Sequence, residues 1–327
     1  MSLSIKRNAK RLVLNEDAVT GKRQNVRISR ILLISLLLLF FAVLFLLYGP
    51  YSGFRTFWIT TAMHTSDHKY LASLIYPQKT IKQVLQANSV EILDDKTNTD
   101  FLDVQYNDSI ELLDVSGAMC KGHLLIIHDP SRVSLVTSSG ENGFLLEELC
   151  QPIDAVAGIS ASAYITNNRR GIPLGLVISE GSMISPGVSG IHSIIGIDRS
   201  DRLILGMYTD RDTDDLNLRD AVEYGPFLII NGEMADISGN GGGIAPRAAI
   251  GQTADGAILF LVLDGRELES LGATMTDVQS ILAENGAINA ACLDGGATVS
   301  LYYQDTIINS ITGGTYNRRL PNAFVVK

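Results

Sequence analysis

The chain has 327 residues, of which 19% are charged, 46% are hydrophobic and 9 are proline. This composition excludes an intrinsically disordered chain, a collagen-like repeat and a polytopic membrane protein, while the length allows two domains or one large one. The net charge of -9 is unevenly divided, because residues 1–30 carry eight Lys and Arg against two acidic residues, or +6. The rest of the chain therefore sums to -15, which opposes binding to nucleic-acid phosphates.

An uninterrupted apolar run follows the basic stretch at residues 31–48, with Ser35 as its one polar residue before the final tyrosine. As a helix it spans about 27 Å, close to the roughly 30 Å hydrocarbon core of a bilayer. The alternatives are a cleaved signal peptide, which normally has a shorter apolar region and basic lead, and a buried core helix. Because positive charge stays in the cytoplasm, we expect a single-pass signal anchor in the cell membrane, with residues 1–30 inside and residues 49–327 outside.

Residues 49–108 are expected to form a helical stalk and a linker. Apolar side chains recur at helical spacing between residues 54 and 87, and Pro77 divides them into two helical pieces. Residues 88–109 are polar and acidic without sustained periodicity, which is typical of a linker or an irregular domain edge. His64 and His68 stand four residues apart in the stalk, but no third ligand lies nearby, so a metal site is poorly supported.

The external domain, residues 109–327, is predicted to be α+β, dominated by sheet and with few helices. Gly, Asp and Asn separate its short apolar runs, a pattern typical of strands. The runs are 124–127, 133–136, 174–178, 194–197, 203–205, 227–230, 258–263, 299–303 and 324–326. Residues 275–284 are the best helix candidate, with a capping box at Thr274 and Asp277, and residues 144–150 are a shorter one.

Three cysteines are too few for a disulfide scaffold, and an odd number leaves at least one unpaired. The spacing of Cys120 and Cys150 allows a disulfide but does not establish one. Cys292 lies in an apolar run and is expected to be a small buried residue. The sequence has no CxxC motif or Cys/His cluster, so it gives no reason to expect structural zinc or another cofactor.

Two Asp-Gly turns directly follow predicted strands that are apolar apart from Asn289. Residues 257–263 lead into Asp264-Gly265-Arg266, and residues 287–293 lead into Asp294-Gly295-Gly296, with the predicted helix between them. A strand, a helix and a strand over this length form a βαβ unit, whose strands are parallel. Both aspartates should then lie at the edge of the sheet where ligands bind, although ordinary tight turns are the simpler alternative.

A glycine-rich segment at residues 239–243 leads to Arg247. Glycines let a backbone approach a ligand closely, and an arginine offers a planar fork for phosphate. The segment lacks the lysine of a P-loop, and a flexible surface loop is an equally good interpretation.

Five segments of the sequence occur in an order that resembles the phosphodiester glycosidase family, which includes the mannose 6-phosphate uncovering enzyme and bacterial exopolysaccharide-related proteins. The segments are GPFLIINGE at 225–233, APRAAIGQ at 245–252, VLDGR at 262–266, AACLDGG at 290–296 and RRLPNA at 318–323. The anchor and residues 61–71 also resemble the membrane-anchored bacterial members of this family.

The resemblance implies hydrolysis of a sugar-1-phosphodiester, here in cell-envelope or exopolysaccharide glycans, releasing a sugar such as N-acetylglucosamine. It implies no cofactor and leaves open whether a metal assists. Asp264 and Asp294 are the implied catalytic carboxylates, with the roles of acid and base not assigned. The residues implied to bind substrate are Arg247, Arg266, Gly295, Gly296, Thr298, Arg318, Arg319 and Ser160, with Glu233 as a reserve candidate that is otherwise an exposed turn residue.

Three positions depart from the family pattern. Ser160 stands where members usually have Asn, Ala248 where they have Thr, and Ala297 where they have Ser or Gly. The changes remove the Asn amide and a hydroxyl, whose hydrogen bonds could orient the substrate. A catalytically weakened protein that binds or assembles surface polysaccharide is therefore the alternative to an active hydrolase, and a structural anchor for other surface proteins is the third hypothesis.

Overall fold

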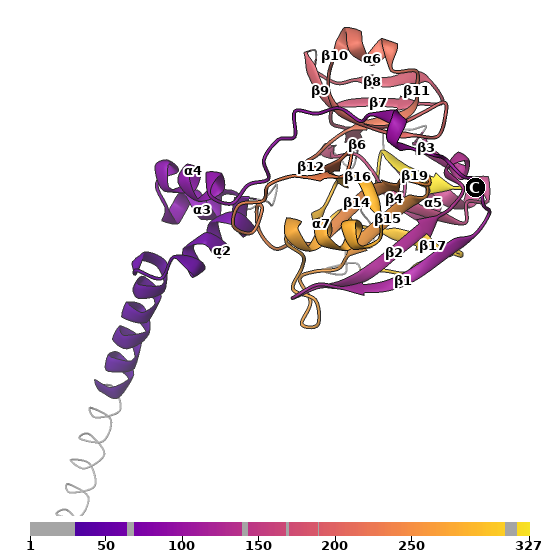
Figure 1. Cartoon of the computed structure of the whole chain (residues 1–327). Coiled ribbons are helices and arrows are strands. Elements are labelled where there is room, and N and C mark those ends of the chain that lie inside the picture. The colour runs from indigo at the N-terminus through magenta and orange to yellow at the C-terminus, as the bar shows by residue number, and fades with distance from the viewer. Residues whose placement is uncertain (1–29, 64–68, 139–142, 168–169, 189, 311–318) are drawn as a thin grey trace, which may run out of the picture. The chain divides into compact units, whose positions relative to one another are not determined.

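The computed structural model describes residues 30–63, 69–138, 143–167, 170–188, 190–310 and 319–327 (Figure 1). The chain forms two units, Met1–Trp58 and Ile59–Lys327, which are treated separately. In the first unit, the helix Arg30–Tyr48 is long and apolar enough to cross a membrane, and its side chains are not buried. A membrane anchor and a signal sequence both fit this helix.

The stalk prediction of helices broken at Pro77 is confirmed. Three short helices, α2 (Ser52–Met63), α3 (Lys69–Ile75) and α4 (Gln78–Gln86), are found where two pieces were expected. Pro77 has an extended backbone and stands directly before α4, since proline cannot supply the amide that a helix interior requires. His64 and His68 lie outside the described residues.

The described part of the domain is dominated by sheets. The seven-stranded sheet has the order β1 (Ile110–Ser116), β2 (Lys121–Ile127), β15 (Ile258–Leu263), β14 (Arg247–Thr253), β16 (Ala287–Leu293), β12 (Phe227–Ile230), β13 (Glu233–Met234). A five-stranded sheet has the order β10 (Leu203–Thr209), β9 (Ile191–Asp198), β11 (Leu218–Glu223), β7 (Leu176–Ser179), β8 (Ser182–Pro186). Another has the order β18 (Thr306–Ile307), β17 (Leu301–Tyr303), β4 (Ala157–Ser160), β19 (Asn322–Val326), β3 (Val133–Thr137), and β5 (Tyr164–Asn167) pairs with β6 (Arg170–Pro173).

Short helices connect these strands. They are α5 (Leu146–Cys150), α6 (Asp210–Asp215), α7 (Met275–Glu284) and the 3-10 turns η1 (Thr99–Phe101), η2 (Pro130–Arg132), η3 (Gln151–Ile153) and η4 (Gly296–Thr298). Helix α7 has the predicted bounds. The Thr274 hydroxyl accepts from the Asp277 amide at 3.1 Å, and the Asp277 carboxylate accepts from the Thr274 amide at 2.8 Å, so both ends of the capping box are satisfied. The α+β class with few helices is confirmed.

The central strands of the seven-stranded sheet are buried on both faces. Phe260 and Val262 of β15 lie in the main core between sheets, whereas Leu259 and Leu261 face the second core, which α7 covers with residues such as Val278 (Figure 1). Burying one such side chain contributes about 1.5–3 kcal/mol. Both faces of β15 are therefore apolar, which explains its continuous hydrophobic sequence.

Strands β15 and β16 are parallel, as the strand-helix-strand pattern predicts, because β14 lies between them and is antiparallel to both. The intervening strand was not among the predicted strands. It has small side chains at Ala248 and Ala249 and a glycine at Gly251, which weaken the usual signal for a strand. Its presence leaves the carboxyl ends of β15 and β16 at one edge of the sheet.

The three cysteines are free and buried. Cys120 packs with Cys292 in the core beneath α7, whereas Cys150 belongs to a separate cluster around α5. The open possibility of a disulfide between Cys120 and Cys150 is therefore not realised.

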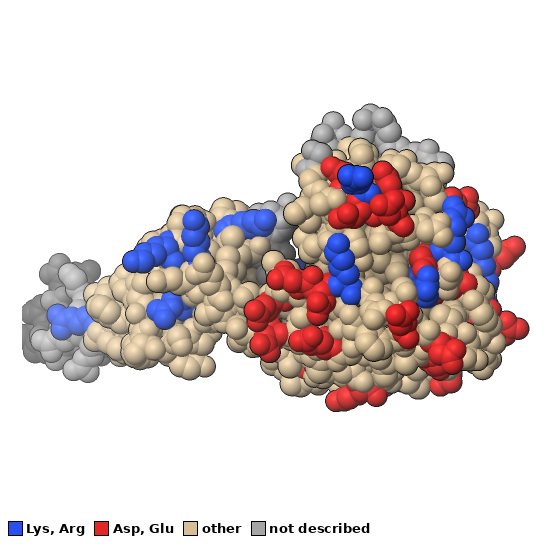
Figure 2. Space-filling view, turned by 45° about the horizontal axis from the view of Figure 1, so that its top comes forward, with Lys and Arg blue, Asp and Glu red and all other residues tan. Residues whose placement is uncertain are grey.

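The segment before β1 lacks long regular elements and runs along the domain as an irregular edge. Val90 forms an isolated bridge with Ile237, and the Thr97 amide donates to the Leu205 carbonyl at 2.9 Å. Figure 2 shows Asp and Glu side chains spread over the visible face of the domain, as the net charge beyond residue 30 predicts.

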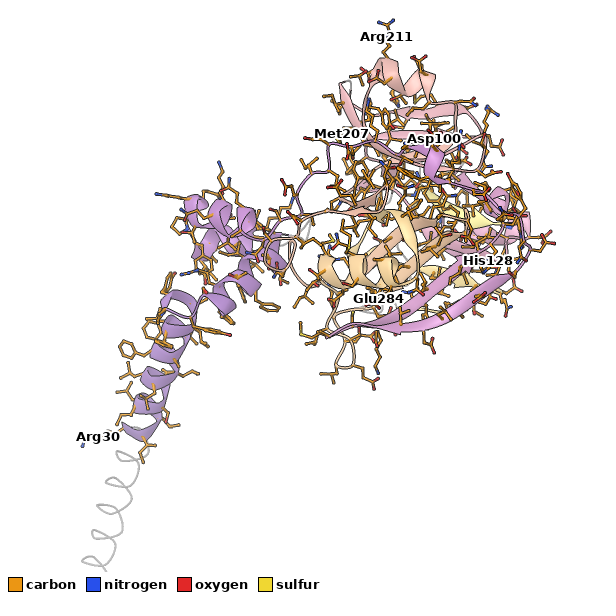
Figure 3. All side chains as sticks on the ribbon, in the orientation of Figure 1. Arg30, Asp100, His128, Met207, Arg211 and Glu284 are labelled. Atoms are coloured by element: carbon orange, nitrogen blue, oxygen red, sulfur yellow. The ribbon has the colours of Figure 1, made fainter. Side chains whose placement is uncertain are left out.

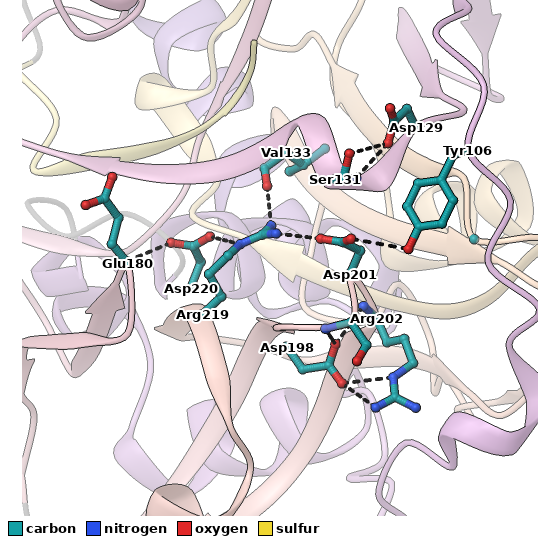
Figure 4. A network of polar contacts seen from close by, with 12 residues as sticks. Tyr106, Asp129, Ser131, Val133, Glu180, Asp198, Asp201, Arg202, Arg219 and Asp220 are labelled. Atoms are coloured by element: carbon teal, nitrogen blue, oxygen red, sulfur yellow. Dashed lines mark hydrogen bonds and ion pairs between the residues drawn. The ribbon is translucent and has the colours of Figure 1, made fainter.

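A charge network ties the five-stranded sheet that contains β11 to β3, which belongs to the other five-stranded sheet (Figure 4). The Arg219 guanidinium donates to Asp220 at 2.8 Å, to Asp201 at 2.5 Å and to the Val133 carbonyl. Burial alone lowers the pKa of Arg219, but the hydrogen bonds and charges of the two carboxylates outweigh it and raise that pKa. The positive charge of Arg219 is thus satisfied within the chain.

Candidate active site

Arg247 lies between the ends of the strands that carry the two predicted catalytic carboxylates. It is the first residue of β14, opposite Leu263 of β15, and the next residue of β14 is opposite Leu293 of β16. Asp264 and Asp294 directly follow those two leucines. The prediction that both aspartates share one edge of the sheet is therefore confirmed, with an arginine between the two strand ends.

Close backbone packing explains the glycines at this edge. The Gly296 amide donates to the Pro246 carbonyl at 2.9 Å. A Cβ atom at Gly265 would lie 2.8 Å from the Pro246 nitrogen, and one at Gly295 would lie 3.2 Å from the Pro246 carbonyl oxygen. A side chain at Gly265 would therefore force the turns away from β14.

The Arg247 guanidinium is buried, with the residue 6% exposed, and its hydrogen bonds go to backbone carbonyls. Nη2 donates to the Gly243 carbonyl at 2.8 Å, and Nε donates to the Ala273 carbonyl at 3.4 Å. Within the described part of the chain, no carboxylate lies within 4.0 Å of it, and burial lowers the pKa of Arg247. A buried cation of this kind favours an anionic ligand, because its charge is otherwise poorly compensated.

Asp264 lies in a largely dry environment and is 9% exposed. Its Oδ1 accepts from the Ser310 amide at 3.1 Å and from Asn309 Nδ2 at 3.4 Å. Burial raises the pKa of Asp264, and these two hydrogen bonds oppose the rise only in part. A carboxyl group with a raised pKa is suited to hold and deliver a proton.

Asp294 is half-buried and is hydrogen-bonded by two hydroxyl groups. Thr298 Oγ1 donates to Asp294 Oδ2 at 3.2 Å, and the Tyr224 hydroxyl also bonds to this carboxylate. Burial, followed by the charge of Asp294, strongly raises the pKa of Tyr224, so the phenol keeps its proton and acts as a donor. These contacts stabilise an ionised Asp294, in contrast to Asp264.

Arg266 approaches the turn that follows Asp294. Its backbone has a φ of 64°, and its Nη2 atom lies 3.9 Å from the position that a Cβ of Gly296 would occupy. The two arginine candidates Arg247 and Arg266 therefore both lie at the edge defined by the two aspartates. Thr298, which the resemblance gives to the substrate, here contacts Asp294.

The end of β4 brings buried polar groups beside Asp294. The Asp294 amide donates to the Ala161 carbonyl at 3.0 Å, and the neighbouring Ser160 and Ser162 are 1% and 2% exposed. The Ser162 amide donates to Asn322 Oδ1 at 3.0 Å. Among the described residues, the hydroxyls of Ser160 and Ser162 and the Nδ2 of Asn322 have no hydrogen-bond partner.

Other predicted site residues lie elsewhere. Glu233 is exposed in β13. The amide of the neighbouring Gly232 donates to the Ile288 carbonyl at 2.8 Å, so Glu233 lies near the start of β16, at the opposite end from Asp294. Arg319 Nη1 binds the Glu148 carboxylate at 3.1 Å and the Gly143 carbonyl at 3.0 Å. Arg318 lies outside the described residues.

The departure at Ala248 does not affect the surface of this site, because the side chain of Ala248 packs in the main core.

The sequence analysis did not predict four residues that lie at this site, namely Tyr224, Asn309, Ser162 and Asn322. Tyr224 directly precedes the Gly225-Pro226 pair of a family-like segment, and Asn322 belongs to another such segment, so these two carried a usable signal. Asn309 follows a short strand and no motif marks it.

In the described residues, no cluster of three or more His, Cys, Asp or Glu side chains is arranged to hold a metal ion. The groups at the shared edge are two carboxylates, two arginines, a tyrosine and several hydroxyls or amides. Such a set can bind an anion, donate a proton and activate a water molecule.

Three known proteins are similar to this chain. The SPbeta prophage-derived uncharacterized protein YomE of Bacillus subtilis is 29% identical over 177 residues, which are 49% of this chain and 26% of that protein. The zebrafish N-acetylglucosamine-1-phosphodiester alpha-N-acetylglucosaminidase catalytic domain, auto-inhibited by its pro-peptide, has a TM-score of 0.54 and 17% identity, covering 73% of this chain and 87% of that one. A hypothetical protein from Synechocystis has a TM-score of 0.48 and 16% identity, covering 67% and 61%.

The zebrafish domain therefore shares the fold. The family model described as phosphodiester glycosidase matches residues 154–327, which contain both candidate carboxylates and both arginines at the shared edge. Since this match spans more than half of the 327 residues, the chain belongs to the phosphodiester glycosidase family.

Proposed function

We propose that this chain hydrolyses a sugar-1-phosphodiester, of the N-acetylglucosamine-1-phosphate type, in glycans of the cell envelope. The observation that carries the proposal is the position of Arg247. Its guanidinium is buried without a carboxylate partner in the described residues, between strands that end in Asp264 and Asp294. A phosphodiester bound to this arginine would neutralise its charge. It would also place a glycosidic bond beside the two carboxylates.

The two carboxylates suit different roles. Asp264 is the proton donor, because burial raises its pKa and so favours the protonated form. Asp294 is the base or nucleophile, because the hydroxyls of Thr298 and Tyr224 stabilise its charged form. In the net reaction the bond between the sugar C1 and the phosphate oxygen breaks, water supplies the new oxygen on C1, and the phosphate leaves as a monoester.

Phosphate is a good leaving group, so this reaction needs less proton donation than an ordinary glycoside does. Arg247 and Arg266 would stabilise the charge that develops on the departing phosphate. The buried polar groups of Ser160, Ser162 and Asn322 would contact the sugar hydroxyls or the N-acetyl group, since they lie beside Asp294 and have hydrogen bonds still to make.

The apolar helix Arg30–Tyr48 supports a location at the cell membrane. With the basic residues 1–30 inside the cell, residues 49–327 lie outside, where envelope glycans are accessible. Protease applied to intact cells should digest the domain and spare the basic tail. Full protection of the domain would contradict this topology.

One observation favours the second candidate, a weakened enzyme that binds surface polysaccharide. Ser160 replaces the usual Asn with a shorter side chain, and its hydroxyl has no partner in the described residues. In that case the site would bind a sugar phosphodiester without turning it over.

A comparison of two substrates tests the proposed reaction. The purified full chain in detergent is incubated with UDP-N-acetylglucosamine and with p-nitrophenyl N-acetylglucosaminide, which has the same sugar without a phosphate. We expect release of N-acetylglucosamine from the first substrate alone. Equal cleavage of both would refute the requirement for phosphate, and binding of the first without cleavage would favour the second candidate.

A further inference from the structure

The glycine-rich loop that holds Arg247 also packs against the segment that leads from the anchor to the domain. Gly243, whose carbonyl accepts from Arg247 Nη2 at 2.8 Å, has a φ of 109°. A Cβ placed on Gly243 would lie 3.1 Å from both the Cβ and the Oγ1 of Thr60. Thr60 belongs to α2 and is 0% exposed, so the loop and the helix meet without a gap.

A second set of contacts ties the other end of the same loop to the chain after α4. The Asn240 amide donates to Asn88 Oδ1 at 3.2 Å, and a Cβ on Gly239 would lie 2.2 Å from that same oxygen. Asn88 is 8% exposed, and its Nδ2 donates to the Val84 carbonyl at 2.8 Å. The loop is therefore held at both ends by residues that precede the domain core.

We infer that Thr60 is a positioning residue for Arg247, and that Thr60 and Asn88 together hold the loop on which the anion-binding site depends. The inference depends on the proposed function, in which Arg247 binds the phosphate. Gly243 has no side chain with which to hold its own place, so the contact with Thr60 sets where its carbonyl lies. That carbonyl accepts the shorter of the two hydrogen bonds of the guanidinium, and a shift of it moves the guanidinium.

This arrangement explains the glycines in functional terms. A larger residue at Gly243 or Gly239 would collide with Thr60 or Asn88, and would push the loop away from the segment that locates it. The stalk is then a structural component of substrate recognition, and a fragment that begins near residue 88 would lack Thr60.

A substitution at Thr60 in the full chain tests the inference. Thr60→Phe adds bulk against Gly243. The control is Thr213→Phe, which adds the same bulk at another buried helical threonine, 4% exposed, in α6. Helix α6 directly follows β10, at the outer end of the five-stranded sheet that contains β10, and Arg211 projects from the domain there (Figure 3).

The measurement is the Kd of UDP-N-acetylglucosamine by calorimetry, together with the melting temperature. We expect Thr60→Phe to raise Kd about fivefold or more, because a displaced charged hydrogen-bond donor weakens binding by about that factor. Thr213→Phe should keep the wild-type Kd. A merely structural role for Thr60 would reduce the fraction of folded protein and leave the Kd of the rest unchanged.

An unchanged Kd for Thr60→Phe would overturn the inference while leaving the proposed function intact. Wild-type protein that does not bind, or Arg247→Ala that binds as well as wild type, would instead overturn the proposed function. If Thr60→Phe does not fold, Gly243→Ala applies the same displacement from the loop side, and a wild-type Kd in that variant would equally refute the inference.

Discussion

Two arginines in this domain, the half-buried Arg219 and the buried Arg247, differ in what neutralises them. Arg219 is enclosed by Asp201 and Asp220, and these carboxylates raise its pKa (Figure 4). Arg247 donates to two backbone carbonyls, and burial lowers its pKa. A paired cation in a closed network serves the structure, whereas a buried cation without a carboxylate neighbour in the described residues is prepared for a ligand.

The surroundings of the two arginines extend this contrast. The hydrogen bonds of Arg219 cross-link β11, in one five-stranded sheet, to β3 in the other. Arg247 stands at the sheet edge that carries two aspartates and a tyrosine, near serine hydroxyls that have no hydrogen-bond partner in the described part of the chain. The predictions below test whether the first cluster determines stability and the second determines activity.

The largest expected effect belongs to Asp294. Asp294→Asn should lower kcat about 10²–10⁴-fold, because the amide cannot accept a proton or attack the sugar carbon. The matched control is Glu233→Gln, which neutralises a carboxylate that lies near the opposite end of β16. The control should retain wild-type kcat and the wild-type melting temperature. Equal activity in Asp294→Asn and wild type would remove Asp294 from the mechanism.

Arg219→Ala should destabilise the domain by about 3–5 kcal/mol, because it leaves Asp201 and Asp220 as uncompensated buried charges. The free energy of unfolding is measured by denaturant titration with a fluorescence signal. The KM of the remaining folded protein should not change. A raised KM with normal stability would reverse the proposed division between the two arginines.

The paired edge of the sheet is a feature that the sequence predicts well. Strand β15 is a continuous apolar run and β16 is apolar apart from Asn289, while the Thr274 capping box and a terminal Asn-Gly mark the bounds of α7. These local signals are strong enough to place Asp264 and Asp294 at one edge without further information.

The sequence does not predict what surrounds the two aspartates, because those contacts join distant segments. Asn309 reaches Asp264 across 45 positions of the chain, and Tyr224 reaches Asp294 from before a different strand. For Arg319 the motif predicts a substrate contact, but its guanidinium donates to the Glu148 carboxylate and the Gly143 carbonyl instead. Residue type and order along the chain do not reveal which of several arginines keeps its charge available.

Asp264 should make stability depend on pH in a defined direction. Because burial raises its pKa above the unfolded value of about 3.9, the folded state holds the proton to higher pH than the unfolded state does. Its contribution to stability is complete below that value and is lost as pH rises through the folded pKa.

Asp264→Asn should therefore reduce the loss of unfolding free energy as pH rises from about 4 through the folded pKa of Asp264. Glu284→Gln, at the exposed end of α7 (Figure 3), is the control and should keep the wild-type dependence. Identical pH profiles for Asp264→Asn and wild type would show that folding does not raise the pKa of Asp264.

The smallest expected effect concerns the sugar. Ser160→Asn restores the amide that family members usually have, and one added hydrogen bond is worth about 0.5–1.5 kcal/mol. We expect kcat/KM for an N-acetylglucosamine phosphodiester to rise by about 2- to 12-fold. Steady-state kinetics with an N-acetylglucosamine and a glucose phosphodiester test this effect, and equal rates for wild type and variant on both substrates would exclude Ser160 from sugar recognition.

The central claim, that Arg247 binds the phosphate of the substrate, is tested most directly by Arg247→Ala in the full chain. Two phosphodiesters that share the phosphate portion and differ in the sugar serve as substrates. The loss of a charged hydrogen bond should raise KM by about 10- to 100-fold for both. An unchanged KM, or an increase confined to one of the two sugars, would contradict the assignment of Arg247 to the phosphate.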